Sequence, residues 1–239
     1  MINLKTRYFW DYIKRFLNFF NRKKDTANTP INASTLVIGI GSGGQNIVDY
    51  IKENNNFCNF RFLAVNSDEQ VLKSAKVETL LFKNIPKNYK NSLGCGGDVN
   101  LAQKLAKTNV KRLADKLKNI SNVILIATLG GGFGTGALPV IANFLNSRKL
   151  SIFVIATLPF CFEGQSKRSI ALKGIEALRK ETTNFLLIEN QIILTQNPKH
   201  QTFKEVFDLI NRQISEYIVR NRIMDKSDET DQFCYCRQF

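Results

Sequence analysis

From about residue 35 to about residue 222, segments with a strand-like pattern of apolar residues alternate with segments that have a helical pattern. Short, continuous apolar runs, typical of strands buried on both faces of a sheet, lie at 35–40, 60–66, 122–128, 151–158 and 184–190. Stretches with helical spacing of their apolar residues lie at 45–53, 101–120, 137–149, 168–182 and 202–222. Strands that alternate with helices in this way predict an α/β fold, a mostly parallel sheet with helices on both faces.

The same pattern divides the chain into four segments. Residues 25–34 are polar, contain a proline and indicate a linker. Residues 35–220 carry the alternating strands and helices and are long enough for one sizeable core. Residues 221–239 form a short polar tail. Residues 1–24, before the linker, have a pattern of their own.

Residues 1–24 are predicted to form a basic amphipathic helix. Its apolar face consists of Phe9, Tyr12, Ile13, Phe16, Leu17 and Phe20. Seven Lys and Arg side chains against Asp11 give the segment a charge of +6. This combination is typical of a helix that lies in an anionic membrane interface or binds a partner. The alternative is a helix docked on the core of its own domain. No base-reading motif accompanies the charge, so nucleic-acid binding is disfavoured.

The composition adds a strong positive charge to this picture. Lys and Arg number 34 against 20 Asp and Glu, so the formal net charge of +14 favours anionic partners. The five cysteines are odd in number and irregularly spaced, which indicates a reducing, cytoplasmic compartment, with residues 1–24 as the route to a membrane-peripheral location. Cys234 and Cys236 with His200 supply too few ligands for structural zinc, so no metal site is predicted.

Three glycine-rich segments lie at 39–46, 93–98 and 130–136. The first and third follow a predicted strand and precede a helix, where exposed backbone N–H groups favour an anion. No Gly-Lys-Ser/Thr follows a glycine loop, so a P-loop is excluded. The spacing Gly39-x-Gly41-x-x-Gly44, with Asp68 as a ribose ligand, also fits a dinucleotide site, which stays as a competing hypothesis.

In chain order, "GIGSGGQN", "FLAVNSD", "LGCGGD", "GGGFGTGALPVIA" and "LPFCFEG" resemble FtsZ, the tubulin-like GTPase of bacterial cell division. The resemblance runs from about residue 35 to about residue 219. It covers most of that family's nucleotide-binding domain and does not extend to its second domain. It implies a site for GTP or GDP, with Mg²⁺ accompanying the nucleotide, and self-association or co-assembly with a full-length FtsZ.

The resemblance also implies which residues contact the nucleotide. The phosphates would be held by Gly41, Ser42, Gly43, Gly44, Gly96, Gly97, Gly131, Gly132, Gly134, Thr135 and Gly136. Asn46 would lie near the guanine and Asn190 would contact the nucleoside, while Asn66 and Asp68 would belong to the nucleotide-binding loop after the second strand. Glu163 would bind the ribose, with Lys167 where the family usually has Arg. Phe203 would stack on the base, and Asp208 would accept from the guanine N1–H and N2–H₂.

Two departures from the family pattern bear on activity. Phe133 stands where the family usually has Thr, and its ring must either enter the core or crowd the phosphates. Asp225 and Asp228 have the mutual spacing of the family's catalytic carboxylates, but Ile223 takes the place of an Asn. Three functions follow: a nucleotide-binding module with weak or lost hydrolysis, an active self-assembling GTPase, or a non-binding remnant that acts through its N-terminal helix.

Overall fold

The computed structural model describes residues 34–55, 60–83, 94–196 and 202–223. The chain divides into two compact units, Thr29–Arg212 and a second made of Met1–Asn28 with Gln213–Phe239. The predicted basic helix at 1–24, most of the linker and most of the polar tail lie outside the described residues. No helix of the described ranges is long and apolar enough to cross a membrane.

The larger unit is built on a six-stranded sheet in which every neighbouring pair of strands is parallel. The order across the sheet is β3-β2-β1-β4-β5-β6. The strands are β1 (Ser34–Ile40), β2 (Phe60–Asn66), β3 (Glu78–Leu81), β4 (Ile120–Thr128), β5 (Ser151–Leu158) and β6 (Phe185–Glu189). The order reverses direction after β3, so the chain returns from the sheet edge to add β4 beside β1.

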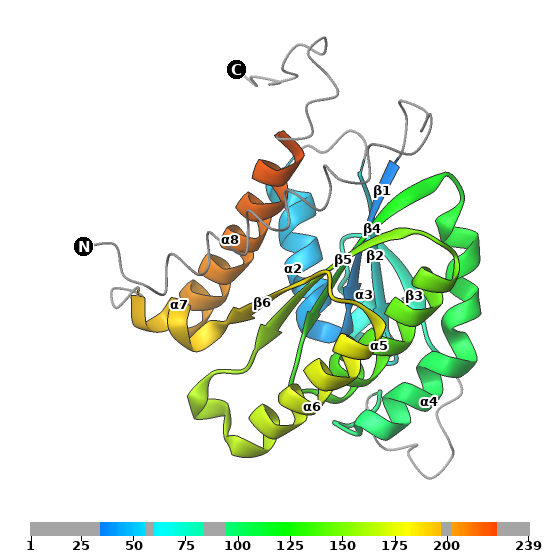
Figure 1. Cartoon of the computed structure of the whole chain (residues 1–239). Helices are drawn as coiled ribbons and strands as arrows, with labels where there is room; N and C mark the ends of the chain where they lie inside the picture. Colours follow the sequence, from blue (N-terminus) through cyan, green and yellow to red (C-terminus); the bar gives the residue numbers. More distant parts are fainter. Residues whose placement is uncertain (1–33, 56–59, 84–93, 197–201, 224–239) are drawn as a thin grey trace. The chain divides into compact units, whose positions relative to one another are not determined.

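Helices cover both faces of this sheet (Figure 1). The helices of the described residues are α2 (Gly41–Asn54), α3 (Glu69–Lys73), α4 (Val99–Asn109), α5 (Gly132–Ser147), α6 (Gln165–Glu181), α7 (Asn190–Gln196) and α8 (Phe203–Ile223), with the 3₁₀ segments η3 (Val110–Leu117) and η4 (Cys161–Glu163). Successive strand residues point to opposite faces. Ile38 and Ile40 of β1 therefore join the core under α5, whereas Gly39 between them touches α2.

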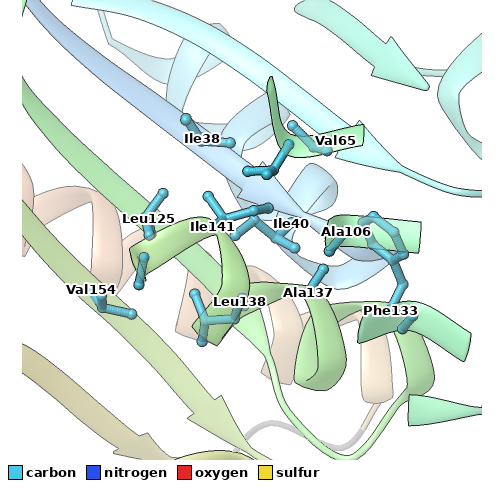
Figure 2. Close-up of a cluster of buried hydrophobic side chains, with 14 of the residues drawn as sticks. Ile38, Ile40, Val65, Ala106, Leu125, Phe133, Ala137, Leu138, Ile141 and Val154 are labelled. Carbon is cyan, nitrogen blue, oxygen red and sulfur yellow. The ribbon is translucent and has the colours of Figure 1, made fainter. Parts of the chain in front are cut away.

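A cluster of buried hydrophobic side chains lies between the sheet and the layer made of α4, α5 and α6. Figure 2 shows Leu138 and Ile141 of α5 among side chains of β1, β2, β4 and β5. Both side chains are fully buried. The structure thus confirms the predicted α/β fold, a parallel sheet covered on both faces.

Several predicted boundaries were wrong. Helices α2 and α5 begin at Gly41 and Gly132, four and five residues before the expected starts, so the glycines form their first turns. The single helix expected over 101–120 is α4 followed by η3, and β4 begins already at Ile120. Strand β3 and helices α3 and α7 were missed, because segments of four to seven residues carry too little periodicity to be recognised.

Candidate functional site

The glycine-rich loops come together at the carboxyl ends of the parallel strands, where ligands bind in folds of this kind. The loop after β1 meets the start of α5, because a Cβ added at Gly41 would lie 3.1 Å from the Gly134 nitrogen. The start of α5 meets the loop before α4, because a Cβ at Gly132 would lie 2.7 Å from the Gly97 carbonyl carbon. Such approaches between backbones are open only to glycine.

The loop after β2 is tied to two of these glycine-rich loops by side chains. Asn66 donates from Nδ2 to Ser42 Oγ at 3.4 Å, and its Oδ1 accepts from the Ser67 amide at 2.8 Å. Ser67 Oγ lies 3.1 Å from Cys95 Sγ, within hydrogen-bonding distance. Burial raises the pKa of the Cys95 thiol, so Cys95 is a neutral packing residue in this loop. Asn66 and Ser67 thus fix the loops against one another.

The helices that start at this edge differ in how their N-termini are capped. Asp68 accepts from the amides of Gln70 and Val71 at the start of α3, and Asp98 accepts from those of Asn100 and Leu101 at the start of α4. Helices α2 and α5 have no side-chain cap and no acidic residue in their first turns. Their first amides and the positive end of each dipole therefore remain available to an anion from outside.

Thr135 shapes the loop before α5 and is not aimed at a ligand. Its Oγ1 accepts from the Gly130 amide at 2.9 Å, and its side chain is buried against Gly174 of α6. The backbone of Thr135 lies in the first turn of α5, as expected of the phosphate loop, whereas its hydroxyl closes the turn that precedes the helix. The side chain is a positioning group.

The Phe133 ring lies in the core and borders the loop after β1, because its Cδ1 would lie 3.9 Å from a Cβ added at Gly41. The ring is only 7% exposed and packs edge-on against Phe82, with centroids 5.8 Å apart and an interplanar angle of 77°. Figure 2 shows it near Ala106 of α4 and Ala137 of α5. Of the two arrangements expected for this residue, the structure shows the ring in the core. The helix start keeps its backbone donors.

Glu163 and Lys167, both predicted to lie near the ribose, contact each other. Glu163 Oε1 accepts from the Phe160 amide at 2.9 Å, and its Oε2 lies 3.1 Å from Lys167 Nζ. The pair holds the turn between η4 and α6. Both side chains keep exposed surface, so their polar atoms remain accessible from solvent.

Aromatic side chains gather where β5 ends and α8 begins. Phe162 stacks on Phe160 at 4.9 Å, and Phe203 packs on Phe162 at 5.0 Å. Phe207 meets Phe160 edge-on at 5.5 Å. Phe162, Phe203 and Phe207 are 55%, 65% and 45% exposed, which leaves a broad aromatic surface at this edge.

Helical geometry separates the two residues expected to hold a base. Phe203 and Asp208 are five residues apart on α8, which places them about 140° apart around the helix. Asp208 is exposed. Phe207 and Asn211, four residues apart, share a face, and Asn211 is 91% buried.

The remaining predicted residues lie at the same edge with the following environments. Asn46 is exposed on the first turns of α2, and Gly96 and Gly97 are exposed with φ of 56° and 86°, a conformation that favours glycine. Asn190, at the start of α7, is buried, and its Oδ1 has no hydrogen-bond partner within the described part of the chain. Asp225 and Asp228 lie outside the described residues.

Comparison with known proteins places this geometry in a family. Residues 34–198 match the model of the tubulin/FtsZ family, GTPase domain. The cell division protein FtsZ of Aquifex aeolicus (strain VF5) is 32% identical over 182 residues, which cover 76% of this chain and 49% of that protein. The chain thus spans about half the length of this relative.

Solved structures agree on the fold. The empty FtsZ dimer of M. jannaschii is similar with a TM-score of 0.71 and 23% identity, over 91% of this chain and 61% of that one. CetZ2 of Haloferax volcanii, a GTPγS-bound protofilament, is similar with a TM-score of 0.70 and 24% identity, over 82% and 60%. Together with the family match, the convergent glycine loops show that this chain belongs to the tubulin/FtsZ family and carries its GTPase domain.

Proposed function

We propose that this chain binds a guanine nucleotide, GTP or GDP, at the carboxyl edge of its sheet. The observation that carries the proposal is the pair of uncapped helix starts, α2 and α5, which meet at Gly41 and Gly134. Two helix N-termini that point to one place suit the charge of a polyphosphate. The burial of Phe133 supports the proposal, because the ring does not take the place of a ligand.

The base and ribose would lie towards α7 and α8. Asn190 Oδ1 is a buried acceptor, and buried polar atoms are rarely left without a partner. A donor on the nucleoside would supply one. We assign Phe207 to the face of the base and Asn211 to its edge, since the two share one side of α8. Asp208 is the alternative edge contact. An amide or carboxylate oxygen would favour guanine, which offers N–H donors at N1 and N2.

Mg²⁺ would bind together with the nucleotide. The carboxylates of Asp68 and Asp98 are each engaged as helix caps. Within the described ranges, no group of three or more His, Cys, Asp or Glu side chains could hold a metal ion. Mg²⁺ often binds through substrate phosphates and water with few protein ligands, and this site would suit that mode. Bound there, the ion would neutralise phosphate charge.

Hydrolysis is proposed to be weak or lost, with the chain acting as a nucleotide-binding module that co-assembles with a full-length FtsZ. The motif that would supply the water-positioning carboxylates, at Asp225 and Asp228, has Ile223 in place of the usual Asn. General-base help of this kind is worth about 10²–10⁴-fold in rate. The second candidate is an active self-assembling GTPase, which the retained spacing of the two aspartates favours.

The binding proposal is tested by two neighbouring glycine variants. A Cβ at Gly131 would meet no atom within 4 Å, whereas a Cβ at Gly132 would press on the backbone of Gly97 and Asp98. We expect Gly131→Ala to lower the affinity for labelled GTP by about tenfold without lowering the midpoint of unfolding, because the methyl group enters the space of the phosphates. Gly132→Ala should lower both the affinity for GTP and the midpoint of unfolding. Unchanged GTP affinity in Gly131→Ala would contradict the proposal.

Hydrolysis is tested separately. Phosphate release is followed for the full chain alone and mixed with a full-length FtsZ. Binding without release in either case supports the module. Release that disappears in Asp225→Ala supports the active GTPase, and failure of GTP and GDP to bind at all leaves the non-binding remnant.

A further inference from the structure

A groove on the outer side of β3 carries cationic side chains that are not part of the proposed nucleotide site. We call it the β3 groove. It has a volume of about 370 Å³ and lies among α3, β3 and η3. Leu72 and Leu80, both buried, provide apolar surface, and the charged residues around it are Lys73, Lys83, Arg112 and Glu69. Because Leu72 and Leu80 are only 7% and 6% exposed, they give the groove a small apolar floor, and the rest of its lining is mainly polar and cationic.

The charges of this groove are not neutralised by neighbours, unlike those beside it. Lys76 pairs with Glu53, and Glu78 pairs with both Arg61 and Lys116. For the side chains of Lys73, Lys83 and Arg112, no ion pair with a carboxylate occurs among the residues that the structure places. Three cations around one hollow face a single acidic side chain, Glu69, so the groove favours an acidic ligand.

Two of the three cations are held by the fold. Arg112 Nη1 donates to the Leu81 carbonyl and, at 3.4 Å, to Asn109 Oδ1. Asn109 is buried, accepts from the Lys83 amide at 3.1 Å and donates to the Lys83 carbonyl at 2.9 Å. A cation on a fixed backbone or in a fixed pose loses less entropy when it binds.

The same hydrogen bonds decide how a partner is recognised. They occupy the Leu81 carbonyl and both backbone groups of Lys83 at the outer edge of the sheet. At the carboxyl end of β3 these backbone groups are not available to another strand. Recognition at this end of the β3 groove therefore comes from side chains, carboxylates on the cations and an apolar group on the leucines.

We propose that the β3 groove binds a short acidic segment of a partner protein, in which an apolar residue is flanked by Asp or Glu. The apolar residue lies against Leu72 and Leu80, and the flanking carboxylates pair with Lys73, Lys83 and Arg112. The volume is within the range of sites for small ligands, so it admits a few side chains and not a folded domain. A concave hollow with an apolar base suits a protruding side chain better than a flat lipid surface.

The test uses the full chain and a fluorescein-labelled peptide, Gly-Ser-Asp-Glu-Leu-Asp-Glu-Ser-Gly. Lys73→Glu with Lys83→Glu reverses two charges of the groove without removing the Arg112 and Asn109 contacts. Lys173→Glu with Lys180→Glu makes the same change of charge at exposed positions of α6. Fluorescence anisotropy gives the affinity, and the midpoint of unfolding of each variant checks its fold.

We expect the groove variant to weaken peptide binding at least about tenfold and the α6 variant to change it by less than about twofold, because only one set of lysines contacts the peptide. Binding should weaken as salt rises. A peptide with Gln and Asn in place of the acids should bind at least about tenfold more weakly. Equal losses in both variants, no binding of the acidic peptide, or equal binding of the neutral one would overturn the proposal.

Two other anions complete the test. Vesicles of phosphatidylserine with phosphatidylcholine and a short DNA duplex are each added as competitors. The peptide proposal fails if either competitor displaces the peptide and also loses more affinity than the peptide does when Lys73 and Lys83 are replaced by Glu. The groove then binds another class of anion. Failure to displace the peptide supports the proposal.

Discussion

At the scale of single residues, Phe133 resolves the conflict between a glycine-rich loop and a bulky side chain. The loop needs glycine where backbones touch, as at Gly132 and Gly134. Between these two glycines the helix turns the side chain of residue 133 to the other side, where Phe82 and the core receive it. A large apolar group is tolerated there because it adds to the core instead of obstructing the loop.

Replacing Phe133 by Ala should therefore cost stability and not gain affinity. We expect the free energy of unfolding to fall by about 3–5 kcal/mol, the usual effect of removing a buried phenyl ring. Phe162→Ala, at a side chain that is 55% exposed, is the matched control and should cost less. Urea unfolding measures both. A rise in GTP affinity in Phe133→Ala would show that the ring had obstructed the site.

Thr135 is the second residue whose role depends on its surroundings. Its hydroxyl accepts from the buried Gly130 amide, so Thr135→Val leaves that amide without a partner. We expect a loss of about 1–3 kcal/mol in the free energy of unfolding. Thr135→Ser keeps the hydroxyl and should lose less. Equal stability of the Val and Ser variants in urea would rule out the hydrogen bond as the cause.

At the scale of elements, two polar side chains join helix α2 to α3 and to the connection between α3 and β3. Asp49 accepts from the Lys76 amide at 2.9 Å, and Gln45 donates to the Val71 carbonyl at 3.0 Å. Both are buried. These contacts position the short α3 and β3 elements, which have little periodicity of their own, against the longer helix.

This junction predicts a pH dependence of stability. Burial raises the pKa of Asp49 above its usual 3.8, against the lowering effects of the Lys76 amide, the Gln45 side chain and the Lys76 charge, while the Glu53 charge adds to the rise. Between 3.8 and the raised pKa the folded state holds a proton that the unfolded state has released. The contribution of Asp49 to stability therefore falls as pH rises through that window.

Asp49→Asn provides the measurement. The amide oxygen can still accept from the Lys76 amide, but the side chain no longer titrates. Relative to this variant, the unmodified chain should be most stable at and below the usual pKa of 3.8 and should lose that advantage as the pH rises through the raised pKa, as followed by urea unfolding. A difference between the two proteins that does not change with pH would show that the carboxyl does not titrate in this way.

At the scale of the whole molecule, the prediction of membrane association depends on the positive charge and on residues 1–24, which precede the sheet. The net charge of +14 is concentrated in part at residues 1–24, which carry +6. The structure describes neither this segment nor residues 224–239. Membrane association through residues 1–24 thus stays a prediction from amphipathic pattern and charge, with docking on the core of its own domain as the alternative.

Sedimentation with anionic vesicles tests this prediction. We expect the full chain to pellet with vesicles that contain phosphatidylserine and to remain in the supernatant with neutral vesicles, because the basic face needs anionic lipid. A chain that starts at Thr35 should not pellet with either. Equal pelleting of the shortened chain would exclude residues 1–24 as the membrane-binding segment.

The sequence by itself determined the order of the longer strands and helices and the location of the glycine loops. Long apolar runs such as those of β2 and β5 specify buried strands at their own positions, and 60–66 and 151–158 were predicted with the observed bounds. A glycine loop between a strand and a helix is likewise a local pattern. Local patterns can be read from one sequence, because the residues that cause them are neighbours in the chain.

Only the tertiary structure decided where side chains point and what they touch. Phe133 meets Phe82, and Thr135 is buried against Gly174. Asn109 holds Lys83 at the edge of the sheet. The two residues of each pair lie far apart in the chain, so no local pattern in the sequence predicts their contact.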